Sequence, residues 1–110
     1  MDKRIDDVFG DYLKDLERLI KHQSVFKESD SSAFGQGIKD ALEEVVLIAQ
    51  EMGFKTYLDE QGRYAYAEIG EGIEMFGVLG HMDVVPAGEL SLWNTDPFQL
   101  VHDDKYVYGR

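Results

Sequence analysis

The stretch that decides the fold is residues 75–88, which read MFGVLGHMDVVPAG. Its first part, residues 75–80, is a short, continuous apolar run bounded by turn signals. Such a run is typical of a strand that is buried on both faces of a sheet. Pro86 ends the pattern, because proline has no amide hydrogen to donate to a strand ladder. We therefore expect a buried strand over 75–80, with polar residues at its carboxyl end.

Two helical stripes precede this expected strand. In each stripe apolar residues recur at steps of three and four, which is typical of a helix with one apolar face. The first stripe consists of Ile5, Val8, Phe9, Tyr12, Leu13, Leu16, Leu19 and Ile20. The second consists of Ile38, Ala41, Leu42, Val45, Val46, Ala49 and Met52. Gly53 stands where a helix commonly ends on glycine, and residues 23–37 between the stripes are expected to form a loop.

A hairpin is expected between the second helix and the buried strand. Residues 54–59 and 64–69 alternate apolar and polar side chains, and Glu60-Gln61-Gly62-Arg63 lies between them. This pattern is typical of two antiparallel strands joined by a tight turn. A second, smaller hairpin is expected over 98–101 and 106–108.

The order of these elements predicts an α/β fold with two N-terminal helices packed on a mixed sheet. No internal repeat or domain boundary is visible in the 110 residues, so we expect residues 1–110 to form one unit.

The composition is that of an ordinary globular chain, with 44% hydrophobic and 30% charged residues. Twenty-two acidic and eleven basic residues give a net charge of −11, which repels phosphate backbones and anionic lipids. We therefore expect no nucleic-acid partner and no membrane partner. The chain has no cysteine, which excludes disulfides and thiolate metal sites and suits the cytoplasm.

The candidate site is the pair His81 and Asp83. In open α/β sheets, ligands collect outside the carboxyl ends of the strands. Residues two apart on a strand share one face, so the two side chains are expected to lie together. A neutral imidazole binds a metal through one nitrogen while a carboxylate holds the ring by the other. From spacing alone, a hydrogen-bonded surface pair remains an open alternative.

Other residues that could carry chemistry have simpler interpretations. His22 follows the first helical stripe and is expected to be solvated or favoured by the helix dipole. His102, Asp103 and Asp104 are typical of a turn. Trp93 is expected to pin a loop. No residue of the sequence is identified as binding an organic cofactor.

Residues 77–88 resemble the first metal-site motif of the co-catalytic zinc exopeptidases. That family includes acetylornithine deacetylase, succinyl-diaminopimelate desuccinylase, aminoacylase, glutamate carboxypeptidase and the bacterial dipeptidases. The similarity continues through Trp93, Asp96-Pro97-Phe98 and Tyr108-Gly109-Arg110. Upstream, Ser32-Ala33-Phe34-Gly35, Ile38-Lys39-Asp40-Ala41-Leu42 and Met52-Gly53-Phe54 are most similar to the Xaa-His (carnosine-cleaving) dipeptidase branch.

The resemblance implies that His81 is a zinc ligand and that Asp83 is the catalytic carboxylate that clamps its ring. In such enzymes two zinc ions polarise the scissile carbonyl and activate water, and a glutamate base takes a proton. Cobalt and manganese also suit such ligands. The family's bridging aspartate, its Glu-Glu pair, its final histidine and its lid domain have no counterpart in this sequence.

The chain is therefore expected to be the N-terminal portion of a metallopeptidase catalytic domain. In the intact protein this domain would hydrolyse dipeptides, whereas the isolated chain is expected to be inactive.

Two alternatives remain open at this stage. The chain could be a non-catalytic acidic α/β interaction module, since a sheet without its later strands leaves an open edge that favours self-association. It could also be a relative of the family that has lost its metals.

Overall fold

The computed structural model describes residues 3–110. Contacts between residues divide them into two compact units, each described separately below. One unit is residues 24–85, and the other combines residues 3–23 with residues 86–110.

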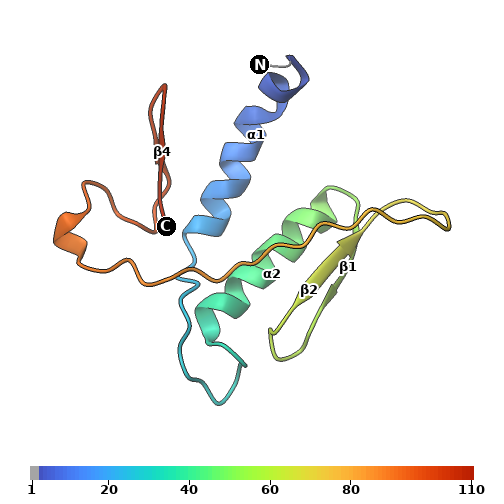
Figure 1. Ribbon diagram of the computed structural model, residues 1–110, viewed down its shortest axis with the longest axis horizontal. Coiled ribbons are helices and arrows are strands. Elements are labelled where there is room, and N and C mark those ends of the chain that lie inside the picture. The colour runs from blue at the N-terminus through green and yellow to red at the C-terminus, as the bar shows by residue number, and fades with distance from the viewer. Residues whose placement is uncertain (1–2) are drawn as a thin grey trace. The chain divides into compact units, whose positions relative to one another are not determined.

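The unit of residues 24–85 contains one helix and one hairpin (Figure 1). Helix α2 (Gln36–Glu51) packs against both strands of an antiparallel pair, β1 (Lys55–Leu58) and β2 (Ala65–Glu68). Its buried side chains are Ile38, Ala41, Leu42 and Ile48, all from the apolar stripe or beside it. The helix and hairpin predicted from periodicity are thus confirmed, and their contact forms the core of this unit.

Glycines with positive φ stand at both ends of α2. Gly53 has a φ of 90°, and the Phe54 amide after it donates to the Ala49 carbonyl at 3.0 Å, which closes the helix as expected. Gly35, before the helix, has a φ of 105°. A Cβ atom at Gly35 would lie 2.8 Å from the Lys27 carbonyl oxygen, so the position requires glycine.

The β1–β2 turn is closed by an ion pair. Asp59 accepts hydrogen bonds from Arg63 Nε at 2.8 Å, from Arg63 Nη2 at 2.6 Å and from the Arg63 amide at 3.1 Å. These hydrogen bonds lower the pKa of Asp59 from 3.8 to about 2, and those from the Arg63 side chain have the largest effect. Gly62, with a φ of 69°, supplies the left-handed residue of the turn.

The prediction of a buried strand at residues 75–80 is wrong. This segment is extended but belongs to no sheet, and Met75, Phe76, Val78 and Leu79 are 87–99% exposed. A buried strand needs neighbours that pair with its amides and cover its faces. The apolar pattern of residues 75–80 is typical of a strand in the interior of a sheet. The pattern does not specify the partner strands that would pair with it. The two sheets in residues 3–110 are separate antiparallel pairs, where a single mixed sheet was expected.

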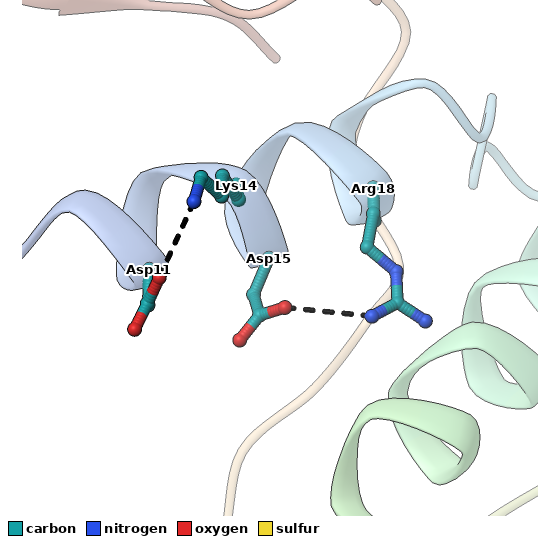
Figure 2. A network of polar contacts seen from close by, with 4 residues as sticks. All are labelled: Asp11, Lys14, Asp15 and Arg18. Atoms are coloured by element: carbon teal, nitrogen blue, oxygen red, sulfur yellow. Dashed lines mark hydrogen bonds and ion pairs between the residues drawn. The ribbon is translucent and has the colours of Figure 1, made fainter. Parts of the chain in front are cut away.

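The other unit begins with helix α1 (Lys3–Ile20). Figure 2 shows two ion pairs along it, Lys14 with Asp11 and Arg18 with Asp15, each at 3.5 Å. None of its side chains is buried, although the members of its apolar stripe from Leu13 onward are half-buried. The predicted helix is therefore confirmed.

Residues 86–110 are held by hydrogen bonds more than by regular structure. They contain a short 3₁₀ turn, η1 (Leu90–Leu92), and a small antiparallel pair, β3 (Val101–His102) and β4 (Val107–Tyr108). Trp93 Nε1 donates to the Ala87 carbonyl at 2.9 Å, so this indole pins the loop as expected. Arg110 closes the segment, since its amide donates to the Pro97 carbonyl at 2.7 Å and its Nη2 to the Pro86 carbonyl at 3.2 Å.

Two helices with small sheets confirm the α/β class. Neither α1 nor α2, the α-helices of residues 3–110, combines the length and hydropathy that a bilayer-spanning segment requires.

Candidate functional site

His81 and Asp83 lie on the extended segment that follows residues 75–80. Both side chains are open to solvent, with exposed fractions of 80% for His81 and 66% for Asp83. The segment is fixed next to them by the Val84 amide, which donates to the carbonyl of the buried Ser24 at 2.9 Å. The pair is therefore accessible to a ligand, while the backbone beside it is anchored.

The two side chains face each other. His81 Nδ1 lies 3.0 Å from the Asp83 carbonyl oxygen and 3.3 Å from the carboxylate oxygen Asp83 Oδ1. A proton on Nδ1 is donated to Asp83 in this arrangement, which leaves the lone pair on Nε2.

The chemistry of this pair fits a metal ligand and its orienting carboxylate. An imidazole that binds a metal typically donates its other N–H to a carboxylate or carbonyl oxygen, which fixes the tautomer and raises the basicity of the ligand nitrogen. Both kinds of acceptor stand at Nδ1, and both come from Asp83. His81 Nε2 is the atom that would bind the metal.

The pair by itself does not make up a complete metal site. Nowhere in residues 3–110 do three or more His, Asp or Glu side chains gather closely enough to hold a metal ion. A catalytic zinc takes about three protein ligands and keeps one position open. His81 would supply one such ligand.

The second histidine–aspartate cluster of the sequence serves a turn. Asp103 accepts hydrogen bonds from the amides of Lys105 at 2.7 Å and Tyr106 at 2.8 Å. These two bonds, followed by one from Tyr108, lower the pKa of Asp103. The interpretation as a turn residue is confirmed for Asp103, whereas His102 lies in strand β3 and pairs with Val107. His22 follows the end of α1, where its amide donates to the Leu19 carbonyl at 3.2 Å.

A groove next to the pair was not predicted from the sequence. Residues 78–83 form one wall, strand β2 another and the apolar face of α2 a third, around a volume of about 770 Å³. Its helical lining consists of Ile38, Leu42, Val45, Val46 and Ala49. The available signal in the sequence was the apolar stripe of α2, which predicts an apolar face of the helix but not what covers it.

Curated relatives match nearly the whole chain, although no family model does. A Staphylococcus haemolyticus protein provisionally named as a dipeptidase is 36% identical over 98% of this chain and 23% of its own length. A Beta-Ala-Xaa dipeptidase from Lactobacillus delbrueckii is 36% identical over 89% of this chain and 21% of its own length. A succinyl-diaminopimelate desuccinylase from Rickettsia felis is 37% identical over 94% of this chain and 26% of its own length.

These matches confirm the resemblance to the peptidase family that contains dipeptidases and desuccinylases. The chain spans about a fifth to a quarter of the length of these relatives. Along its length the chain is similar to one segment of these longer proteins.

Proposed function

We propose that this chain supplies one metal ligand of a zinc-dependent dipeptidase, His81, together with Asp83, the carboxylate that orients its ring. The observation that carries the proposal is the orientation of His81, whose Nδ1 is held by Asp83 while the side chain as a whole is 80% exposed. The names of the relatives support hydrolysis of a dipeptide amide bond as the reaction of the whole protein. Zinc is the preferred metal of the proposal, and cobalt or manganese would suit the same donors.

Each residue of the pair has a separate role in this proposal. His81 binds the metal through Nε2, and the Asp83 carboxylate keeps the ring in the tautomer that leaves Nε2 unprotonated. Zinc, once bound, supplies a Lewis acid that polarises the scissile carbonyl. The general base and the remaining ligands come from other parts of the polypeptide, because His81 is one of about three that the metal needs.

A chimera tests the proposal. Residues 1–110 replace the matching segment of the Lactobacillus delbrueckii dipeptidase, and hydrolysis of a dipeptide by the zinc-loaded protein is measured. His81→Ala is expected to abolish hydrolysis, and Asp83→Asn to lower zinc affinity or activity about 10- to 100-fold, because the ring loses its orienting charge.

His102→Ala is the matched control, since His102 lies in β3 next to a turn that Asp103 organises. This variant should keep the activity of the unmodified chimera. Full activity of the His81→Ala chimera would exclude His81 as a ligand.

The isolated chain is expected to bind zinc weakly and to hydrolyse no dipeptide, because one imidazole does not complete a tetrahedral site. Calorimetric titration of the 110-residue protein with zinc measures this. A submicromolar dissociation constant that disappears in His81→Ala would contradict the view that the pair is a partial site.

A second candidate function is that of an interaction module. Ile73, Met75 and Phe76 are 91–104% exposed, and apolar surface of this kind favours association with another polypeptide, including a second copy of the chain.

A cytoplasmic location completes the proposal and is supported by the absence of cysteine from all 110 residues.

A further inference from the structure

Three tyrosines gather at the β1–β2 hairpin. Tyr57 of β1 stands directly opposite Tyr66 of β2, and Tyr64 lies just before β2 begins. Side chains alternate between the two faces of a strand, and the half-buried residues on either side of Tyr57 belong to the face that meets α2. Tyr57 and Tyr66 therefore project from the opposite face, where they are 42% and 55% exposed.

The rings of these tyrosines are in close contact. Tyr57 and Tyr66 stack with their ring centroids 5.3 Å apart and their planes inclined by 20°, and the rings of Tyr57 and Tyr64 lie 5.8 Å apart. Residues directly opposite each other in an antiparallel pair have Cβ atoms about 4.5–5.5 Å apart, so the backbone register holds Tyr57 and Tyr66 together. Among residues 3–110, no other two tyrosine rings lie as close as these.

The Tyr57 hydroxyl has a polar partner beside it. A hydrogen bond with the Tyr64 side chain raises the pKa of Tyr57, and the negative charges of Asp59 and Glu60 act in the same direction. Tyr57 therefore stays a neutral phenol at neutral pH. A neutral phenol loses a proton together with an electron when it is oxidised to a phenoxyl radical, and the Tyr64 oxygen is in place to relay that proton to water.

Other residues of the chain compete weakly for such an oxidation. There is no cysteine, the residue whose thiolate is most readily oxidised. The rings of Tyr106 and Tyr108 are 6.2 Å apart with planes inclined by 53°, and the Tyr108 hydroxyl donates to Asp103 Oδ2 at 3.3 Å. The hairpin tyrosines are thus better placed for coupling than this second pair.

We propose that Tyr57 and Tyr66 form an oxidative cross-linking site, at which a one-electron oxidant of the haem-peroxidase class joins the two rings into a dityrosine. Each phenol loses one electron and one proton, and the two radicals form a carbon–carbon bond between ring positions ortho to the hydroxyls. The hydrogens at these two carbons then move to the phenol oxygens as protons, which restores both hydroxyls. Hydrogen peroxide takes up the two electrons and two protons and is reduced to two molecules of water.

The cross-link would tie β1 to β2 on the face away from α2. It would close a covalent loop over residues 57–66 and restrict the unfolded chain, as a disulfide does. A chain without cysteine has no disulfide available for this purpose. The site does not involve His81, so the inference is independent of the proposed function.

The experiment oxidises the full 110-residue chain with a haem peroxidase and one equivalent of hydrogen peroxide. Low salt is used, because the net charge of −11 then keeps copies of the chain apart. The monomer is expected to become lighter by two hydrogen atoms and to acquire the fluorescence of dityrosine, and peptide mapping should join Tyr57 to Tyr66. Oxidation of methionine adds oxygen instead, so the mass distinguishes it.

Three variants locate the cross-link. Tyr66→Phe keeps the ring but removes its hydroxyl, and it should abolish the cross-linked monomer, as should Tyr57→Phe. Tyr106→Phe is the matched control from the second tyrosine pair and should leave the yield unchanged. Amide exchange at Asp59, whose amide donates to the Tyr64 carbonyl at 3.0 Å, reports whether the hairpin still forms in each variant.

Several outcomes would overturn the inference. These are cross-links found only between separate chains, an intramolecular product that joins Tyr106 to Tyr108 or Tyr57 to Tyr64, or methionine sulfoxide without any dityrosine. Undiminished yield of the cross-linked monomer from Tyr66→Phe would also reject the assignment. Zinc binding by the chimera tests the proposed function alone and does not bear on this site.

Discussion

The Asp59–Arg63 ion pair ties the stability of the β1–β2 turn to pH. The Asp59 side chain is 6% exposed, and three hydrogen bonds from Arg63 favour its charged form. The pKa of Asp59 is about 2 in the folded chain and 3.8 ordinarily, so the folded state is the one that binds the proton less readily. The stabilisation is complete above pH 3.8 and is lost as the pH falls towards 2.

We expect Asp59→Asn to lower the free energy of unfolding at neutral pH and to remove this acid-dependent loss. Urea unfolding followed by circular dichroism at several values between pH 2 and 7 measures both effects. Asp11→Asn is the control, because its pair with Lys14 is highly exposed and contributes little. Parallel pH profiles for the unmodified chain and Asp59→Asn would show that the ion pair does not stabilise the turn.

At the level of single residues, spacing predicted which side chains lie together but not their surroundings. The two-residue step from His81 to Asp83 indicated proximity, and the contact at Nδ1 agrees with it. The metal role of the pair stays a prediction. The Asp59–Arg63 pair was not predicted, because its strength depends on the burial of Asp59 beneath the turn, which a four-residue spacing does not specify.

The two glycines that flank α2 differ in what an added Cβ atom would contact. Gly35 and Gly53 both have positive φ, but a Cβ would meet the Lys27 backbone at Gly35 and nothing within 4 Å at Gly53. Gly53→Ala should cost about 1 kcal/mol, from the backbone conformation alone. Gly35→Ala should cost about 3 kcal/mol or more, because its backbone region is almost exclusive to glycine and the clash adds to the strain.

The free energy of unfolding of each variant, from urea denaturation, measures the difference. Equal losses at the two positions would mean that the segment around Lys27 shifts readily.

Elements defined by local contacts were predicted well. Helices α1 and α2 and the β1–β2 hairpin satisfy their backbone hydrogen bonds internally or between neighbouring residues, so periodicity and turn glycines suffice to locate them. Residues 75–80 differ, because a strand buried in a sheet needs partners remote in sequence. The second hairpin was located correctly, but it pairs only two residues on each side.

The net charge of the chain opposes self-association, whereas its exposed apolar surface favours it. A net charge of −11 keeps copies apart at low salt, whereas Phe76 and Leu79 are 92% and 99% exposed. Screening shortens the range of repulsion from about 10 Å at 0.1 M salt to about 3 Å at 1 M. We therefore expect the protein to be monomeric at low salt and to associate as the salt concentration rises.

Light scattering across a salt series measures this as a rise in average molar mass. The double variant Phe76→Asp/Leu79→Asp should remain monomeric throughout. Association of this variant at the same salt concentration as the unmodified chain would place the contact elsewhere.

At the scale of the whole chain, the α/β class followed from the order of helical and strand patterns. The division into residues 24–85 and the remainder did not follow, because both units are built from segments of similar composition and no linker marks their junction. The groove beside β2 depends on where residues 78–83 run, which no local pattern specifies.

Trp93 is the only tryptophan of the chain, and its indole N–H is bound to the Ala87 carbonyl. The protein thus carries an intrinsic optical reporter in the loop directly after its histidine–aspartate motif. Fluorescence excited selectively in the indole comes from this loop alone, and its emission wavelength responds to the polarity around the ring. Rearrangement of the loop when a metal or another polypeptide binds can therefore be followed in a fluorimeter without attaching a dye.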